Sequence, residues 1–239
     1  MLYSLMLITQ AKTFDWKEGE VTKPLSKEDC ELKFQDCHLA SEEQKLYIPN
    51  YSAEIAPISK ELKAKMMGKS FHENCPVPIE DLSTIQLMYW NPEGEIHWGH
   101  ITIASMQAEN VAKIFGELYE ARFPIVSMRL IHEFNGSDDA SMKANNTSGF
   151  NCRHIKNTNR WSQHSYGQAI DINPLWNPWV LGDRVDPPEG KAFIDRNNPQ
   201  PGIIRAGDAT VQSFEKYGWK WGGYWKKTKD YQHFSASGR

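Results

Sequence analysis

The chain has 239 residues, of which 40% are hydrophobic and 24% charged, an ordinary composition for a globular protein that buries a core. Its length fits one large domain, or one domain with an extension. The net charge of −3 gives no electrostatic basis for binding nucleic acid. No apolar run approaches the roughly 20 residues that a membrane-spanning helix needs.

The beginning of the chain carries no recognisable motif. We predict that residues 1–50 form an N-terminal extension of unknown role, followed by one domain over residues 51–239. Residues 1–11 are apolar but lack the positively charged start of a signal peptide. They are compatible with a buried segment, a signal-peptide remnant or a misassigned start. Further along, Ser26 precedes acidic residues and marks the start of a helix.

The four cysteines, Cys30, Cys37, Cys75 and Cys152, include no Cys-x-x-Cys pair, which argues against a structural zinc knuckle. Cys30 and Cys37 could be bridged in an oxidising compartment, but an even number of cysteines does not decide this. The sequence therefore leaves the compartment open.

Regular elements become readable after residue 57. Residues 58–68 have a serine cap, apolar residues at helical spacing and a glycine stop, which predict a short helix. Residues 82–90 and 96–104 have strand composition and flank a turn at 91–95, which predicts a hairpin. Residues 108–122 carry apolar side chains at helical spacing.

The second half of the chain is less regular. Residues 124–131 are predicted to form a third strand, and the polar residues 136–151 a long loop. Residues 176–202 are interrupted by proline and glycine and predict little regular structure. Residues 208–218 predict a capped helix that ends at glycine, and residues 219–225 and 231–234 close the domain as strand and loop. A hairpin, separate helices and a short central sheet indicate an α+β fold.

Residues 164–171 place two polar side chains next to apolar residues that are typical of a core. His164 and Asp171 lie on either side of Gly167, and the aspartate is flanked by isoleucines. A carboxylate among core residues is almost never buried unless it is paired or bound to a metal, so Asp171 needs a partner such as His164. A straight strand would place positions seven apart on opposite faces, and Gly167 can supply the bend that brings them together.

A second fragment near the end of the chain places Asp230 three residues before His233. Taken singly, each histidine would more often be structural. Together, the two fragments supply two histidines and one carboxylate that could hold a metal, and a second carboxylate that could move protons. That set matches a catalytic zinc site, which has three protein ligands, an open position for water and a general base.

These two fragments resemble the zinc signature of a known family. Residues 162–171 read Ser-Gln-His-Ser-Tyr-Gly-Gln-Ala-Ile-Asp and residues 230–233 read Asp-Tyr-Gln-His, as in the D-alanyl-D-alanine carboxypeptidase and L-alanyl-D-glutamate endopeptidase family. Further matches are residues 147–153, Asn173 with Pro174, residues 201–203 and residues 218–223. The resemblance covers roughly residues 57–236. It implies the hedgehog/DD-peptidase-like zinc fold, with a small central antiparallel sheet and flanking helices.

The resemblance also implies roles for individual residues. His164, Asp171 and His233 would bind Zn²⁺. Asp230 would be the general base, at a position where other members of the wider group have glutamate.

Two more positions match the family outside the metal motifs. Arg153 corresponds to the arginine that holds the substrate and stabilises the oxyanion, although an arginine in this place could also be a surface residue. Ser148 fits a position near the substrate, although a loop serine is more often a turn residue.

The resemblance implies a hydrolase, a zinc metallopeptidase that cuts an amide bond in the peptide stem of bacterial peptidoglycan. Both a D-alanine carboxypeptidase and an L-Ala-D-Glu-type endopeptidase are compatible with it. The alternative is a non-catalytic zinc-containing cell-wall-binding module on the same fold, against which the complete set of site residues argues. Peptidoglycan as the partner implies a periplasmic or extracellular location, reached by export or, for a phage-derived protein, by release with lysis.

Other polar clusters are weaker candidates. His97 and His100 have metal-ligand spacing but sit on the outgoing strand of the predicted hairpin, and we interpret them as structural. His132 and Glu133 precede the polar loop. They could contact the ligands of a metal site without binding the metal, or simply be exposed. The acidic pair at 138–139 could bind a cation, but a solvated loop is the better interpretation.

Overall fold

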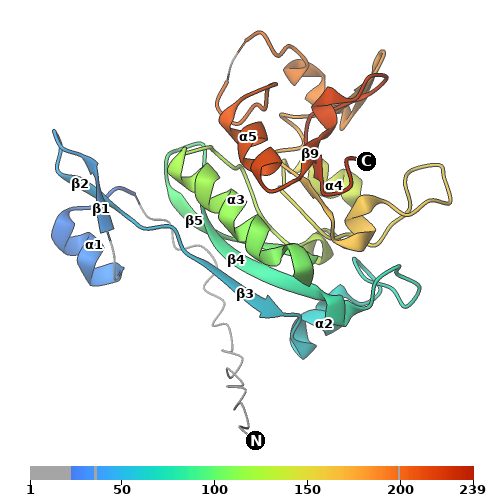
Figure 1. Ribbon diagram of the computed structural model, residues 1–239, viewed down its shortest axis with the longest axis horizontal. Helices are drawn as coiled ribbons and strands as arrows, with labels where there is room; N and C mark the ends of the chain where they lie inside the picture. Colours follow the sequence, from blue (N-terminus) through green and yellow to red (C-terminus); the bar gives the residue numbers. More distant parts are fainter. Residues whose placement is uncertain (1–22, 35–36, 199) are drawn as a thin grey trace, which may run out of the picture.

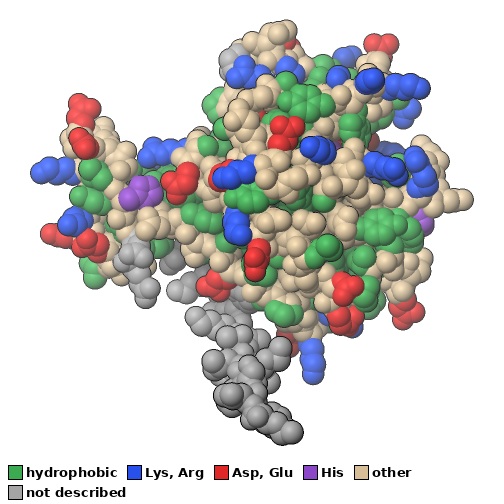
Figure 2. Space-filling view, viewed as in Figure 1, with side chains coloured by type: hydrophobic (Ala, Val, Ile, Leu, Met, Phe, Trp, Pro, Cys, Tyr) green, Lys and Arg blue, Asp and Glu red, His purple; other side chains and the backbone are tan. Residues whose placement is uncertain are grey.

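The computed structural model describes residues 23–34, 37–198 and 200–239. Small antiparallel sheets and several helices make up the main body, and a small N-terminal unit lies to one side of it (Figure 1). This mixture agrees with the predicted α+β class. Acidic and basic side chains are interspersed over the face seen in Figure 2. Within the described part of the chain, no helix has the length and apolar character needed to cross a membrane.

The N-terminal unit consists of α1 (Lys27–Lys33) and the antiparallel pair β1 (Cys37–Ser41) and β2 (Leu46–Pro49). Ser26 caps α1 as predicted, because its hydroxyl accepts a hydrogen bond from the Asp29 backbone. A disulfide between Cys30 and Cys37 settles the pairing that the sequence left open. The apolar residues 1–11 lie outside the described residues.

The largest sheet is formed by β3 (Ala53–Pro57), β4 (Leu82–Trp90) and β5 (Ile96–Ala104), in that order. The hairpin β4–β5 has the predicted ends. Its register places Ile85 opposite Ile101, and both side chains are fully buried. Nearly every residue of β4 is buried, and Ile85 and Ile101 belong to the largest apolar cluster of the core.

Helix α3 (Ala108–Glu120) crosses one face of this sheet (Figure 1), and its apolar stripe, predicted from spacing, faces the core. Helix α5 (Ala209–Lys216) packs against the same core. Asp208 caps α5 by accepting a hydrogen bond from the Val211 backbone at 2.9 Å. Phe214 of α5 stacks on Phe234 at a ring distance of 3.9 Å, which joins the core to the last strand of the chain.

The prediction that residues 124–131 form a third strand is wrong. The strand that pairs with the β4–β5 hairpin is β3, which comes earlier in the chain. The segment makes only isolated bridges, at Pro124 and Ser127. Asparagine side chains take the place of a neighbouring strand: Asn173 Oδ1 accepts from Val126 N at 3.0 Å, and Asn146 Oδ1 accepts from Arg129 N at 2.8 Å. These side chains satisfy backbone groups that a strand would otherwise pair.

The loop prediction for residues 136–151 is also incomplete, because the segment contains α4 (Asp138–Lys143). Ser137 caps this helix by accepting from Ala140 N, a start signal that the polar composition obscured. Residues 176–202 include a short antiparallel hairpin of β7 (Trp179–Leu181) and β8 (Arg184–Asp186), followed by η5 (Pro188–Phe193). Strand β10 (Lys229–Asp230) pairs with β7.

A third small sheet has the order β6-β11-β9, with β6 (Ala169–Asp171), β11 (His233–Ser235) and β9 (Lys220–Trp221). The remaining short helices are α2 (Lys60–Met66), η1 (Ile79–Asp81), η2 (Ser105–Gln107), η3 (Ile131–Phe134), η4 (Gln163–Tyr166) and η6 (Gly222–Tyr224). Helix α2 is capped by Ser59 as predicted. A second disulfide, Cys75–Cys152, which the sequence analysis did not identify, ties the region after α2 to the approach of the candidate site.

Candidate metal centre

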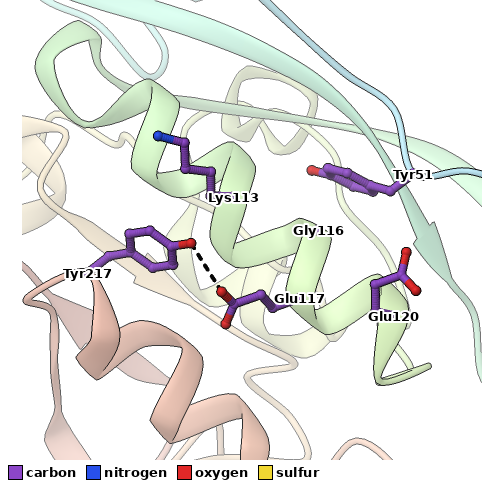
Figure 3. A pocket seen from close by; sticks show the side chains of 6 residues that line it. All are labelled: Tyr51, Lys113, Gly116, Glu117, Glu120 and Tyr217. Carbon is purple, nitrogen blue, oxygen red and sulfur yellow. Dashed lines mark hydrogen bonds between the residues drawn. The ribbon is translucent and has the colours of Figure 1, made fainter.

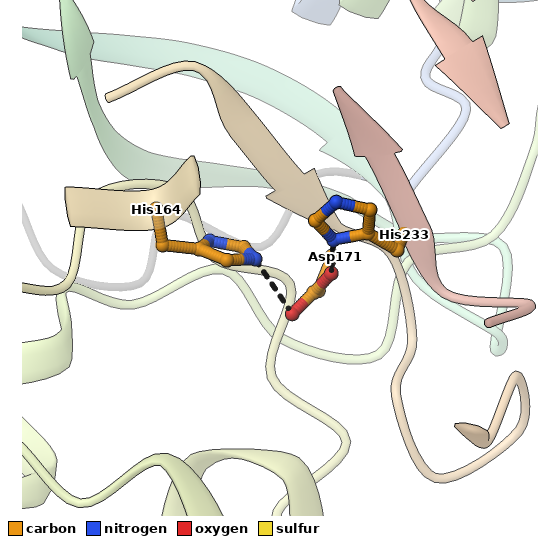
Figure 4. Close-up of side chains that lie close together, drawn as sticks. All are labelled: His164, Asp171 and His233. Carbon is orange, nitrogen blue, oxygen red and sulfur yellow. Dashed lines mark hydrogen bonds and ion pairs between the residues drawn. The ribbon is translucent and has the colours of Figure 1, made fainter. Parts of the chain in front are cut away.

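Three side chains from separate elements meet at one point (Figure 4). His164 comes from η4, Asp171 ends β6 and His233 begins β11, where it lies directly opposite Asp171. All three are buried, and their possible ligand atoms lie within 4.8 Å of one another. Among the described residues, no other group of three or more His, Cys, Asp or Glu side chains has this geometry.

The expected bend lies at Gly167, which has a φ of +61°. This left-handed conformation ends η4 and turns the chain into β6, so that His164 and Asp171 face each other. A Cβ at this glycine would lie 2.4 Å from Ala104 N, which instead donates a hydrogen bond to Gly167 O at 2.9 Å. The bend is therefore anchored on the end of β5, and only glycine fits there.

Backbone carbonyls orient both histidine rings. His164 Nδ1 lies 2.6 Å from Gly149 O, and His233 Nε2 lies 3.0 Å from Arg239 O. A carbonyl only accepts hydrogen bonds, so these nitrogens carry the ring protons. His164 Nε2 and His233 Nδ1 then face Asp171, at 3.1 Å from Oδ2 and 3.0 Å from Oδ1. Fixing the far nitrogen in this way is how proteins orient metal-binding histidines.

The donor set fits a zinc ion. Two imidazole nitrogens and a carboxylate are ligands that zinc takes in catalytic sites. His164 Nε2 is buried without a hydrogen-bond partner in the described structure, although it lies close to the Asp171 carboxylate. A buried nitrogen in this state lacks an interaction that a bound cation would provide.

The three side chains also interact electrostatically, which shifts the pKa values of Asp171 and His233. Burial alone would raise the pKa of Asp171, but His164 and His233 outweigh it and hold that pKa well below its usual range. Burial opposes a charge on His233, yet the Asp171 carboxylate raises the pKa of His233 to about 9. Without metal, the site therefore balances a buried carboxylate with a proton that a cation could displace.

Asp230 lies beside this group on β10, where it pairs with Trp179 of β7. Burial raises the pKa of its carboxyl to about 7, although His233 acts in the opposite direction. Its Oδ1 is buried and has no hydrogen-bond partner among the described residues. Gly222 permits this arrangement, since a Cβ there would come within 2.8 Å of the Asp230 Cβ. The result is a confined carboxyl group whose proton is exchangeable near neutral pH.

Arg153 is held from several sides. Its backbone N donates to Ser165 Oγ at 2.9 Å, next to His164, and its Nη2 lies 2.7 Å from Asp138 Oδ2. Its positive charge acts to lower the pKa of Asp230, so the guanidinium is electrostatically coupled to the centre. Its Nε is buried without a hydrogen-bond partner in the described structure.

The backbone of Ser148 contacts the backbone of Asp171 in the centre. Its N donates to Asp171 O at 3.0 Å, and Asp171 N donates to Ser148 O at 2.9 Å. The next residue, Gly149, supplies the carbonyl that orients His164. Residues 148–149 thus hold two of the three clustered side chains in place.

The sequence analysis missed three residues around the centre. Ser165 lies in the motif next to His164 and fixes the Arg153 backbone, so its position was visible but its role was not. Asp138 was interpreted as part of a solvated loop. The Trp225 ring lies 5.5 Å from the His233 ring and forms one wall beside it.

The weaker candidates do not form metal sites. His97 stacks on Tyr89 and its Nε2 lies 3.0 Å from Asn91 Nδ2, while burial lowers the pKa of His100 to about 4. Being three apart on a strand, the two histidines point to opposite faces. Glu133 pairs with Arg129 at 2.8 Å instead of entering the centre.

The acidic pair at 138–139 is not a solvated loop. It forms the first turn of α4, and its two carboxylates pair with Arg153 and Lys156. Each negative charge is thus matched by a cation of the chain.

Two open cavities lie elsewhere, and neither is lined by a residue of the metal centre. One, of about 530 Å³, lies beside α3 (Figure 3) and is lined by Tyr51, Lys113, Gly116, Glu117, Glu120 and Tyr217. Its Glu117 already accepts a hydrogen bond from Tyr217 and pairs with Lys216. The other, of about 460 Å³, is lined by Arg196 and residues 205–208.

Comparison with models of protein families gives a match over part of the chain. The family model described as D-alanyl-D-alanine carboxypeptidase matches residues 156–236, which include His164, Asp171, Asp230 and His233. The match is shorter than the resemblance expected from the sequence and does not reach Arg153. No curated protein and no solved structure matches the chain significantly. Residues 156–236, which carry both metal motifs, are therefore similar to the D-alanyl-D-alanine carboxypeptidase family.

Proposed function

We propose that this protein is a zinc-dependent peptidase that hydrolyses an amide bond in the peptide stem of bacterial peptidoglycan. One observation carries the proposal: a buried cluster of His164, Asp171 and His233 with metal-ligand geometry lies beside Asp230, whose Oδ1 has no hydrogen-bond partner in the described part of the chain. All four residues fall within the segment that matches a peptidase family.

In this proposal, His164 Nε2, a carboxylate oxygen of Asp171 and His233 Nδ1 hold the zinc ion. The ion supplies Lewis-acid chemistry, which lowers the pKa of water and polarises a substrate carbonyl. The chain contributes the rigidity of the site, because Gly149 O and Arg239 O fix the two rings.

Asp230 is the proposed general base. Its unpartnered Oδ1 accepts a proton from the water that attacks the amide carbon, and the same carboxyl then gives the proton to the leaving amine. Burial favours the protonated form, while a nearby cation would favour the carboxylate, which poises the group for transfer in both directions. The close approach of Gly222 and the pairing with β7 fix this short side chain in place.

Arg153 and Ser148 are the proposed substrate-binding residues. The unpartnered Nε–H of Arg153 can donate to the carbonyl oxygen of the scissile bond, where negative charge develops. Ser148 pairs through its backbone with Asp171, so a substrate bound at the centre passes close to it.

Both a D-alanine carboxypeptidase and an L-Ala-D-Glu-type endopeptidase agree with this site. For either one, the substrate lies outside the cytoplasmic membrane. The two disulfides support a periplasmic or extracellular location, because such bonds persist in oxidising compartments.

The test is digestion of purified peptidoglycan and defined stem peptides by the zinc-loaded protein, with the products identified by mass spectrometry. We expect one type of amide bond to be cut, and cutting to stop after zinc is removed by a chelator. The mass of the product distinguishes loss of a terminal D-alanine from cleavage within the stem. Binding of zinc and peptidoglycan without any hydrolysis would contradict the proposal and favour a non-catalytic cell-wall-binding module.

A further inference from the structure

Among the described residues, the side chain of Arg153 forms one ion pair. Its Nη2 lies 2.7 Å from Asp138 Oδ2, and the two side chains are only 28% and 26% exposed. An ion pair that is largely shielded from water is held more firmly than one on the open surface. Asp138 is therefore well placed to restrict the orientation of the guanidinium.

The backbone of Arg153 is held in place by hydrogen bonds, so the side chain moves mainly by rotation about its own torsion angles. Its N donates to Ser165 Oγ at 2.9 Å, and its O accepts from Ser162 N at 3.0 Å. The preceding residue, Cys152, is tied to Cys75 by a disulfide. With the Cα position fixed in this way, a single carboxylate partner can decide where the guanidinium points.

The interaction with Asp138 uses one end of the guanidinium and leaves another donor unused. Arg153 Nε is buried and has no hydrogen-bond partner among the described residues. A buried N–H without an acceptor is unfavourable, so a ligand oxygen that reached this nitrogen would gain a hydrogen bond there. The positive charge of Arg153 also acts to lower the pKa of Asp230, so the guanidinium interacts electrostatically with the candidate centre.

We propose that Asp138 is a positioning residue: its carboxylate holds the Arg153 guanidinium so that the Nε–H stays directed to a carbonyl oxygen of the substrate. The inference rests on the proposed function, in which Arg153 binds that substrate. Asp138 itself touches neither the substrate nor the metal. It acts only through Arg153.

The neighbouring Asp139 offers a matched control. It lies in the same turn of α4 and carries the same charge, but its side chain is 72% exposed and its partner is Lys156, at 3.6 Å. Replacing either aspartate by asparagine removes one negative charge from the same region. Only the Asp138 replacement removes the negative charge that pairs with Arg153.

The first experiment measures steady-state cleavage of a stem peptide by Asp138→Asn, Asp139→Asn and Asp138→Glu. We expect kcat/KM to fall by about tenfold to a hundredfold in Asp138→Asn, since a misplaced binding group costs about that much. Asp139→Asn should stay within about twofold, and Asp138→Glu should recover part of the loss. In an Arg153→Ala background, Asp138→Asn should change kcat/KM by less than about twofold, because the residue acts only through Arg153.

The second experiment needs no activity. The NMR signals of the Arg153 guanidinium report how freely it rotates, and zinc content and thermal unfolding show whether each variant is folded. We expect restricted rotation in the wild type and in Asp139→Asn, and faster rotation in Asp138→Asn with unchanged zinc content. Equal mobility in all three proteins overturns the proposal, whatever the activities are.

The outcomes separate this inference from the proposed function. If Arg153→Ala loses activity and Asp138→Asn does not, the positioning role is wrong and the peptidase proposal stands. If Arg153→Ala keeps full activity, the substrate-binding role of Arg153 fails, and the inference falls with it. If the wild type cleaves no stem peptide, the proposed function fails, and the NMR comparison still decides whether Asp138 holds the guanidinium.

Discussion

The hairpin sheet and the sheet of the metal centre are built in different ways. Strands β4 and β5 have nine residues each and pair along their whole length, whereas β6, β11 and β9 have three, three and two. The long hairpin is held by buried apolar side chains against α3. The short sheet depends on contacts between side chains and backbone, such as His164 Nδ1 with Gly149 O. A regular apolar scaffold thus supports a polar site that regular structure alone could not hold.

Histidines illustrate the same difference. On the hairpin, His97 and His100 follow the strand, point to opposite faces and form no cluster. At the centre, His164 and His233 come from a 3-10 turn and a short strand, and they converge on Asp171. Spacing along the sequence therefore says little about a metal site until the bends between the ligands are known.

The largest effect should come from removing a proposed ligand. We expect His164→Ala or Asp171→Ala to abolish peptidase activity and to weaken zinc binding by at least about a hundredfold, since even residues that only support a ligand are worth up to that amount. Cleavage assays and zinc titration measure both. His97→Ala, in the hairpin, should bind zinc like the wild type. Equal losses in His97→Ala and His164→Ala would remove the contrast between the two regions.

Replacing the proposed base should separate chemistry from metal binding. We expect Asp230→Asn to lower kcat by about 10²- to 10⁴-fold, the usual contribution of a general base, while one zinc ion stays bound. Parallel measurements of kcat and zinc content test this. Full activity in Asp230→Asn would show that another group moves the proton.

Replacing Gly167, which lies at the junction of the two regions, should destabilise the fold more than replacing a glycine elsewhere. Gly167 and Gly218 both have positive φ, so alanine at either costs roughly 1–2 kcal/mol of folding free energy. A Cβ at Gly167 would also collide with Ala104 N, whereas nothing lies within 4 Å at Gly218. We expect Gly167→Ala to lose clearly more stability in denaturant unfolding. Equal losses would mean that the close approach to β5 is unimportant.

The smallest effect concerns pH. In the metal-free protein the pKa of His233 is raised to about 9, so the ring is protonated at neutral pH and zinc must displace that proton. Zinc affinity should therefore rise with pH, by up to about tenfold per pH unit, and level off above about pH 9. Competition with a chromophoric chelator at several pH values measures this slope. An affinity independent of pH would contradict the assigned proton.

The scaffold was readable from the sequence because apolar spacing and capping residues determine it. The ends of β4 and β5 and the caps of α1, α2 and α5 follow directly from that pattern. The segment at 124–131 was mistaken for a strand because its backbone is satisfied by Asn146 and Asn173, which lie far away in the sequence. Composition cannot reveal such a partner.

The candidate site could be predicted from the sequence only in part. Its clustered residues were expected from the two sequence fragments and from resemblance to a family, and Gly167 was the local signal for how His164 and Asp171 meet. The contact between Asp138 and Arg153 depends on where α4 begins, which the polar composition of residues 136–151 concealed. Long-range side-chain contacts of this kind need the fold before they can be inferred.

The most direct test of the account is the metal content of the purified protein, measured by elemental analysis for the wild type, His233→Ala and His97→Ala. We expect about one zinc ion per chain in the wild type and in His97→Ala, and none in His233→Ala. A wild-type protein that holds no zinc after reconstitution, or a His233→Ala variant that keeps it, would contradict the assignment of the metal centre.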